Sequence, residues 1–304
     1  MERIKLKIIN IQHIFPVFLV LLVLFSCSKS EDNSPIDGGN NPIPDVDETL
    51  PDTLKIISYN ILEGMKNDRS NNYNKFVDWI KSYAPDVLAL QEVNGFNQRK
   101  LEELAKRYGH SYVITNLKST DNYPVAITSK YPIESRRRIT LHTSHGAIFA
   151  KLKNTDINIV NTHFWPQTYW KSVGDGRGDE YRLQEANVNL DSTIRKFPNE
   201  KSWLYLGDFN AVNRKDYDAG TTNQSFLVLD EIQNAGFLDV VHHLHGYKLN
   251  NTANYAFNYP GRRIDFIFGT TEILSKVTKA MPIYDEFTAV YSDHPPIMVH
   301  ILNK

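Results

Sequence analysis

The sequence predicts an α/β domain whose strands end in polar side chains. Runs of apolar residues typical of strands recur along the chain, and segments with a helical spacing of apolar residues lie between them. The segment 203–210 is the clearest case, because four mostly apolar residues run into Gly207 and then into Asp208 and Asn210. Residues two apart share one face of a strand, so a carboxylate and a carboxamide emerge together where a buried strand ends. A carboxylate is costly there unless a metal, a cation or a substrate proton uses it, although strand-end aspartates also cap turns and helices.

The composition allows one domain of ordinary size. The chain has 304 residues, of which 41% are hydrophobic and 23% charged, and its formal net charge is -1. These values fit a single globular domain of about 250 residues once the N-terminus is set aside. A charge near zero gives no global attraction to nucleic acid, which leaves only a local basic patch for that purpose. The single cysteine, Cys27, excludes intrachain disulfides and cysteine-rich zinc sites.

The N-terminus has the pattern of a targeting signal. Arg3, Lys5 and Lys7 precede the apolar run 14–25, which is shorter than the roughly 18 to 20 residues of a membrane span. This pattern fits a secretory signal. The run ends in Leu-Phe-Ser-Cys, which resembles the lipobox of bacterial lipoproteins, so we expect residues 1–27 to be a lipoprotein signal peptide that leaves Cys27 acylated. An uncleaved signal anchor with an incidental cysteine is the alternative.

The next segment reads as a linker. Residues 28–52 are rich in Ser, Asn, Asp, Gly and Pro, which predicts a disordered tether between lipid and domain. Residues 29–32 resemble the acidic export signal of surface lipoproteins in Bacteroidetes, and solvated linker charge is the alternative. The expected location is the bacterial cell envelope, on the periplasmic or surface face of the outer membrane.

The first part of the domain, which begins at residue 53, alternates strands with helices. We expect strands at 54–60 and 86–92 and helices at 72–83 and 98–108. Asn72 is the expected cap of the first helix, Ala84-Pro85 stops it, and Gly109 ends the second. The two strands finish in Asn60 and Glu92.

Shorter strands follow, separated by turns, which suggests an antiparallel portion. They are expected at 110–114, 123–129, 139–142 and 148–152, with turns at 131–132 and 144–146. The arginines at 136–138 are either a phosphate patch or, the favoured interpretation, the solvated edge of a strand.

The last part of the domain returns to longer elements. We expect strands at 156–163, 263–268 and 297–301 and helices at 179–196 and 225–235. Between them, Trp165 lies in an aromatic loop that forms a substrate wall or packs in the core. Arg177, in a glycine-rich run, reaches a charged substrate or remains a surface charge. Tyr123 is a further candidate for phosphate contact.

Six strand edges carry groups suited to one reaction, at the location where α/β proteins build their sites. The groups are Asn60, Glu92, His163, Asp208 with Asn210, Asp265, and Asp293 with His294. Acids and amides suit a hard cation such as Mg²⁺, which prefers oxygen ligands, and no histidine or cysteine pattern argues for zinc. Two histidines beside such a cation could contact phosphate oxygens during an in-line displacement.

The segments around these residues resemble the successive motifs of the endonuclease/exonuclease/phosphatase superfamily. In chain order they are Ser58-Tyr-Asn60, Leu90-Gln-Glu92-Val, Asn161-Thr-His163, Gly207-Asp-Phe-Asn210, Arg263-Ile-Asp265 and Ser292-Asp-His294-Pro. The resemblance covers about 53–304 and implies a deoxyribonuclease I-like fold: a four-layered α/β sandwich of two mixed sheets packed face to face, with helices outside. It is specific for the superfamily and weakly specific for the substrate.

The resemblance also implies a role for each residue. Glu92 would hold Mg²⁺, or Mn²⁺ in its place, with Asn60 and Asp293 near the metal. Asp208 would orient and deprotonate the attacking water. Asn210 and His163 would hydrogen-bond the phosphate oxygens, and His294, paired with Asp265, would donate to the scissile phosphate. A carboxylate beside an imidazole fixes its tautomer and favours its charged form. Because His294 follows Asp293 and precedes a proline, we expect a local turn there.

The expected protein is therefore a lipid-anchored, Mg²⁺-dependent phosphoesterase outside the cytoplasm, and a monomer. Its substrate is a small phosphoester, a lipid head group or nucleic acid. A secreted nuclease acting on DNA or RNA is the alternative among enzymes, and the absence of a long basic stripe argues against a dedicated binder of duplex DNA. A surface lipoprotein that keeps the fold only for binding is the alternative outside enzymes.

Overall fold

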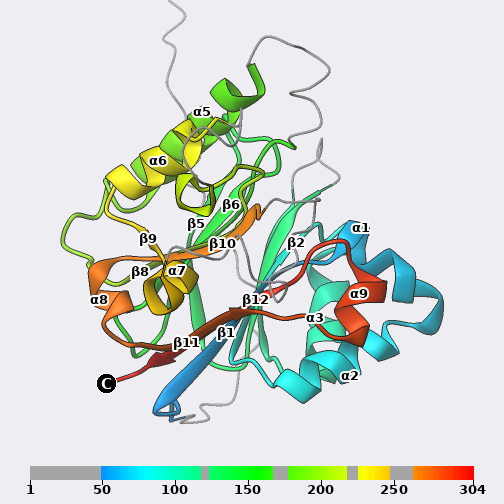
Figure 1. Cartoon of the computed structure of the whole chain (residues 1–304). Helices are drawn as coiled ribbons and strands as arrows, with labels where there is room; N and C mark the ends of the chain where they lie inside the picture. Colours follow the sequence, from blue (N-terminus) through cyan, green and yellow to red (C-terminus); the bar gives the residue numbers. More distant parts are fainter. Residues whose placement is uncertain (1–48, 118–122, 167–176, 218–224, 247–262) are drawn as a thin grey trace, which may run out of the picture. The chain divides into compact units, whose positions relative to one another are not determined.

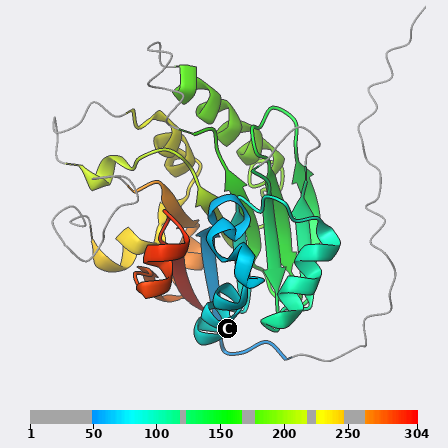
Figure 2. The same cartoon turned by 90° about the vertical axis from the view of Figure 1, so that its right-hand side faces the viewer.

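Two mixed β-sheets of six strands each make up the fold of the computed structural model (Figures 1 and 2). Every element described below belongs to the unit 48–304 of the chain. The structure describes residues 49–117, 123–166, 177–217, 225–246 and 263–304. In these residues no helix is both long and apolar enough to cross a membrane.

The first sheet has the strand order β11-β12-β1-β2-β4-β3. Only its central pair, β1 and β2, is parallel, and the other neighbours are antiparallel. Its strands are β1 Thr53–Asn60, β2 Val87–Gln91, β3 Tyr112–Asn116, β4 Val125–Ser129, β11 Val277–Pro282 and β12 Ile297–Leu302. The helical elements that accompany it in the chain are α1 Leu62–Met65, η1 Lys66–Asn71, α2 Asn74–Tyr83, α3 Gln98–Arg107 and α9 Glu286–Tyr291.

The second sheet repeats this plan. Its order is β5-β6-β7-β8-β10-β9, with β7 and β8 as the parallel central pair. Its strands are β5 Ile133–Ile139, β6 Ala147–Leu152, β7 Asn158–His163, β8 Trp203–Asp208, β9 Leu238–Asp239 and β10 Asp265–Gly269. The helical elements in this part of the chain are α5 Arg177–Ser192, η2 Arg214–Asp216, α6 Leu227–Asn234, α7 Val240–His245 and α8 Thr271–Leu274.

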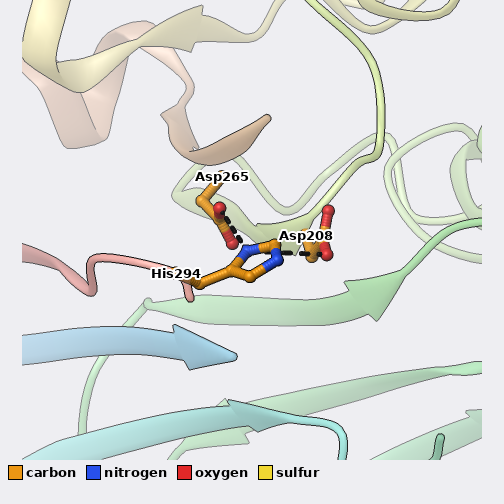
Figure 3. Close-up of side chains that lie close together, drawn as sticks. All are labelled: Asp208, Asp265 and His294. Carbon is orange, nitrogen blue, oxygen red and sulfur yellow. Dashed lines mark hydrogen bonds and ion pairs between the residues drawn. The ribbon is translucent and has the colours of Figure 1, made fainter. Parts of the chain in front are cut away.

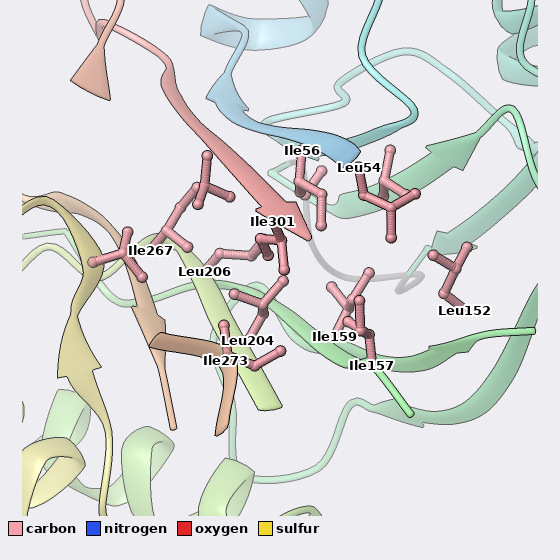
Figure 4. Packing of buried hydrophobic residues seen from close by; sticks show 14 of the residues in the cluster. Leu54, Ile56, Leu152, Ile157, Ile159, Leu204, Leu206, Ile267, Ile273 and Ile301 are labelled. Carbon is pink, nitrogen blue, oxygen red and sulfur yellow. The ribbon is translucent and has the colours of Figure 1, made fainter. Parts of the chain in front are cut away.

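Both faces of each sheet are buried, which confirms the four-layered α/β sandwich. Aliphatic side chains of the two sheets, such as Ile56, Val299, Ile159 and Leu206, pack between them in one cluster (Figure 4). Helices α2 and α3 cover the outer face of the first sheet, and α5 and α6 that of the second (Figure 1). Strands buried on both faces carry near-continuous apolar runs, as in the segment that becomes β8.

The strand directions gather the polar strand ends at one edge. The parallel pairs β1–β2 and β7–β8 deliver their C-terminal residues there. The antiparallel neighbours β12 and β10 begin at the same edge, so His294 precedes β12 and Asp265 opens β10. In the second sheet His163, Asp208 and Asp265 are direct register partners across three strands.

The prediction that Asn72 caps α2 is wrong. Asn72 and Tyr73 both have left-handed backbone conformations, and no side chain of the N-cap residue bonds the helix. Instead the carboxylate of buried Asp68 accepts a hydrogen bond from the N–H of Phe76 at 2.8 Å. A capping acceptor thus comes from the preceding 3-10 helix, which the local sequence pattern does not reveal.

The strand expected at 139–142 lies earlier in the chain. β5 spans Ile133–Ile139 and forms the edge of the second sheet, paired with β6 along its length. Arg136 and Arg137 are exposed on it, and Arg136 pairs with Glu134. The structure therefore supports the solvated edge over the phosphate patch; pairing with β6, rather than local hydrophobicity, defines this strand.

Buried His110 should make the fold sensitive to acid. Its Nε2 lies 2.8 Å from the Pro85 carbonyl and its Nδ1 2.8 Å from the Thr128 hydroxyl, and burial lowers its pKa to about 4. The unfolded chain takes up a proton near pH 6.5 and the folded chain only near pH 4. Stability should therefore fall by up to about 3 kcal/mol between these values as pH decreases.

The free energy of unfolding, measured by chemical denaturation at several pH values, tests the role of His110 in this pH dependence. His110→Gln should flatten the decline between pH 6.5 and pH 4. His243→Gln, which changes an exposed histidine on α7, should keep the wild-type slope. Equal slopes for the wild type and the His110 variant would refute the role of His110.

Candidate active site

Asp208 lies at the centre of the polar edge. Its Oδ1 accepts a hydrogen bond from the N–H of Asn210 at 2.9 Å, and its Oδ2 accepts one from Asn60 Nδ2 at 3.1 Å. The side chain is buried, and burial together with the nearby carboxylate of Asp265 raises its pKa. A carboxylate with a raised pKa is a stronger proton acceptor than an exposed aspartate.

Gly207 is needed for this placement. Its φ is +137°, and a Cβ there would lie 2.0 Å from the carbonyl oxygen of Thr162 on β7. The glycine before Asp208 therefore allows β8 to approach β7 closely, and this approach sets His163 and Asp208 side by side in the register.

His294 forms an ion pair with Asp265. Its Nδ1 lies 2.8 Å from Asp265 Oδ2 and 3.8 Å from Asp208 Oδ2, so the imidazole lies between two carboxylates (Figure 3). Burial lowers the pKa of His294, but the charges of Asp265 and Asp208 outweigh it and raise the pKa well above its usual range. Asp265 thus fixes a charged imidazolium whose Nε2–H remains for another acceptor.

His163 is held as the neutral tautomer. Its Nδ1 lies 3.4 Å from the carbonyl of Tyr123, which can only accept, so the proton is on Nδ1. Burial and the neighbouring His145 lower its pKa to about 3. Its Nε2, 3.6 Å from Asp208 Oδ2, therefore offers a lone pair. The expected hydrogen bond between His163 and the phosphate oxygens stays a prediction.

Glu92 is fixed by a strained turn. Four consecutive residues, Leu62 to Met65, have φ between 45° and 71°, and Glu92 itself has a φ of 58°. The N–H of Glu63 donates to Glu92 Oε2 at 2.8 Å, and Asn60 Nδ2 donates to Oε1 at 3.1 Å. Such backbone costs about 1–3 kcal/mol per non-glycine residue and typically persists at functional sites.

Asn60 joins the acids through its amide nitrogen. Its Oδ1 accepts from the N–H of Leu62 at 3.1 Å, so Nδ2 faces both Glu92 and Asp208. The structure thus shows Asn60 as a donor that holds two carboxylates. Asn210 also has a left-handed φ of 46°, and its Nδ2 donates to the Phe164 carbonyl.

The remaining predicted residues lie at different distances from this group. The bend expected at Asp293 and His294 is present, with His294 buried and the side chain of Asp293 58% exposed, its Oδ1 4.0 Å from His294 Nε2. The Tyr123 ring contacts His163 edge-on. Trp165 is half-buried, and the centroid of its ring lies 6.0 Å from that of the Tyr181 ring. Arg177 begins α5, but its side chain and Cys27 lie outside the described residues.

Asn161 connects the two sheets beneath the site. Its Oδ1 accepts from Gln91 Nε2 at 2.7 Å, and its Nδ2 donates to the carbonyls of Leu90 and Ala126. The sequence pattern aligns Asn161 with His163, but only the contact between sheets gives it this role.

Replacing Asn161 should destabilise the domain. Asn161→Leu leaves Gln91 and two buried carbonyls without these partners, so we expect a loss of about 2–4 kcal/mol in the free energy of unfolding. Urea denaturation measures it. Asn199→Leu, at an exposed position, should change stability by less than about 0.5 kcal/mol; an equally small loss at Asn161 would contradict the connecting role.

The sequence pattern does not single out two buried charged residues of α5, Arg182 and Glu185. Glu185 accepts hydrogen bonds from the N–H of Trp165 and from the N–H and hydroxyl of Ser144, and Arg182 donates to the Trp165 carbonyl. The spacing of three residues on one helix face is the signal that could have indicated a shared target. For His145, next to Ser144, the sequence pattern indicates only a turn.

With this geometry established, comparison with known proteins gives a family. Residues 57–294 match the model of the Endonuclease/Exonuclease/phosphatase family. This chain belongs to that family. Members of the endonuclease/exonuclease/phosphatase family hydrolyse phosphoesters, and the protein is accordingly a phosphoester hydrolase of this family. A search of curated proteins gives no match.

Two solved structures share the fold of this family member. An AP endonuclease from Archaeoglobus fulgidus superposes with a TM-score of 0.63 at 22% identity, covering 81% of this chain and 98% of that one. The AP endonuclease LMAP from Leishmania major gives a TM-score of 0.62 at 16% identity, covering 83% and 88%. At these identities the likeness establishes the fold.

The site chemistry fits the divalent cation on which this family typically depends. Each of Asp208, Asp265 and His294 offers one ligand atom, and these three atoms lie within 4.8 Å of one another. Glu92 is tied to Asp208 through the same amide of Asn60. Burial raises the pKa of both Asp208 and Asp265, so these carboxylates are crowded in a poorly solvated place, and a hard cation with oxygen ligands would relieve that crowding.

Proposed function

We propose that this protein is a Mg²⁺-dependent phosphoesterase that cleaves a phosphodiester or phosphomonoester by in-line attack of water. The observation that carries the proposal is the buried group of Asp208, Asp265 and His294. In it a carboxylate of raised pKa lies 3.8 Å from an imidazole that its neighbours keep charged. A proton acceptor and a cationic donor near one phosphate are the groups that this reaction requires.

Each side chain has a step that follows from its contacts. Asp208, oriented by Asn210 and Asn60, accepts the proton of the attacking water. His294 donates its Nε2–H to a phosphate oxygen, while Asp265 balances its charge. His163, with its lone pair on Nε2 beside Asp208, holds the same water by accepting a hydrogen bond. Asn210 completes the group that positions the phosphate.

Glu92 and Asp293 would hold Mg²⁺, with Asn60 beside it, and Mn²⁺ suits the same oxygen donors. When bound, the cation stabilises the negative charge that develops on the phosphate. The strained turn at Leu62 to Met65 orients Glu92 for this purpose, because the backbone N–H of Glu63 in this turn donates to the carboxylate.

Removing the charge of Glu92 should weaken metal dependence. We expect Glu92→Gln to raise the Mg²⁺ concentration for half-maximal activity by at least about tenfold and to lower the maximal rate. Titration of activity with Mg²⁺ measures both. Glu103→Gln, at an exposed position on α3, should titrate as the wild type does. An unchanged titration for the Glu92 variant would exclude Glu92 as a ligand.

The proposed place of action is the cell envelope. The basic and apolar residues before Cys27 and the polar segment 28–52 support a lipid anchor with a flexible linker, which would leave a monomeric enzyme domain outside the cytoplasm. Mass spectrometry of Cys27 in membrane extracts tests this. A diacylated N-terminal cysteine supports the anchor, and an intact N-terminus contradicts it.

Nucleic acid is the first substrate to test, because the two solved structures compared above are AP endonucleases. The purified protein is incubated with supercoiled plasmid and Mg²⁺, with EDTA and Asp208→Ala as controls. Nicking that both controls abolish establishes a metal-dependent nuclease. If a folded protein leaves the plasmid intact, phospholipids, phosphosugars and small phosphodiesters are assayed under the same controls. No hydrolysis of any of them would favour a binding lipoprotein.

A further inference from the structure

A second imidazole lies against His163. His145 belongs to the turn between β5 and β6, two residues before Ala147, whose register partner is Thr162 on β7. The rings of His145 and His163 are 4.4 Å apart between centroids, with 34° between their planes. The turn therefore places a histidine outside the strand-end motifs at the same edge as the site.

His145 is as accessible as the residues already assigned to the site. Its side chain is 8% exposed, compared with 4% for His163 and 7% for His294. The Tyr123 ring contacts it edge-on at 5.4 Å between centroids. After the larger effect of burial, the neighbouring His145 contributes to the lowered pKa of His163, so His163 stays neutral beside it.

Glu185 holds this turn in place. Its carboxylate is 3% exposed and accepts two hydrogen bonds from Ser144, the residue before His145, and one at 2.8 Å from the N–H of Trp165. Burial raises the pKa of Glu185, while these bonds and the charge of His145 oppose the rise. A buried carboxylate with three donors is a firm anchor, and it fixes the two loops that flank His163.

We propose that His145 is a further substrate-contacting residue, which donates a hydrogen bond to an oxygen of the bound phosphate, and that Glu185 is the residue that positions it. The proposal rests on the function proposed above. It supplies what His163 does not, since the Nδ1–H of His163 is directed at the Tyr123 carbonyl and its Nε2 only accepts. Together with His294, which precedes β12 in the other sheet, the phosphate then has a donor from each sheet.

Binding of inorganic phosphate to the whole chain tests the proposal without relying on turnover. The histidine ring signals are followed by NMR during a phosphate titration with Mg²⁺ present, and the His145 signal is identified as the one that is missing from the spectrum of His145→Phe. The His145 signal should shift at saturation. A titration that leaves it unmoved, with or without shifts of other histidines, overturns the proposal.

Variants give the energetic counterpart. His145→Phe keeps a stacked ring and removes the donor, so phosphate affinity and 1/KM should fall about ten- to a hundredfold, with a smaller change in kcat. His142→Gln, an exposed histidine of the same turn, should bind as the wild type does. Glu185→Gln should weaken phosphate binding, and the double variant with His145→Phe should bind no more weakly than His145→Phe alone. Wild-type affinity in His145→Phe overturns the proposal.

The two proposals fail in different ways. A protein that binds phosphate at His145 but hydrolyses no phosphoester contradicts only the proposed function. A metal-dependent hydrolase whose His145 signal ignores phosphate contradicts only this inference.

Discussion

Asp208→Asn should lower kcat by about 10²–10⁴-fold while the domain stays folded. The carboxamide has the shape of the carboxylate and can still accept the hydrogen bond from the N–H of Asn210, so the loop keeps its support. What disappears is the proton acceptor whose pKa burial and Asp265 raise. Removing a crowded buried charge should also leave the melting temperature unchanged or higher.

The effect of Asp208→Asn on kcat is measured from initial rates at saturating Mg²⁺ and substrate, and its effect on stability is measured from thermal melts. Asp78→Asn changes an exposed aspartate on α2 and should keep the wild-type rate and melting temperature. A rate within about threefold of the wild type for Asp208→Asn would remove Asp208 from the proton transfer. A collapsed melting temperature would assign it a structural role instead.

His294→Gln should cost about 10²–10³-fold in kcat, the usual effect of removing one donor to a developing oxyanion. Asp265 acts through His294, because its Oδ2 lies 2.8 Å from His294 Nδ1 and its charge raises the pKa of the imidazole. Asp265→Asn should therefore also slow the reaction. Adding it to His294→Gln should cause little further loss, since the group that it supports is already gone.

A double-mutant cycle on kcat measures this coupling. Losses that simply add would show that Asp265 and His294 act independently. His243→Gln, on the exposed side of α7, is the matched histidine control and should leave kcat unchanged.

Several features of this fold are local and could be read from the sequence. The apolar run before Asp208 forms β8 because a near-continuous apolar segment that ends at a glycine is typical of a buried strand end. Ala84-Pro85 ends α2 for a similarly local reason, since the residue before a proline disfavours the helical conformation. The motif order then indicates the family, which the match over 57–294 confirms.

Other features depend on contacts between distant segments. β5 is defined by its pairing with β6, and α2 receives a capping bond from Asp68 instead of Asn72. β9 has only two residues and exists because β10 pairs with it. Segments this short carry too little periodicity for a pattern to specify them, and the neighbouring strand supplies the energy that orders them.

The sequence by itself determined which residues are candidates for the chemistry, namely the acids, amides and histidines at the strand ends. It also predicts an anchor at Cys27 from the pattern of the N-terminus. Only the tertiary structure decided what each one does. It turned the amide of Asn60 toward two acids, put the proton of His163 on Nδ1, and brought His145 and Glu185 to the site. The physical reason is that residue types are written locally, whereas burial, tautomer and charge depend on neighbours that fold in from other strands.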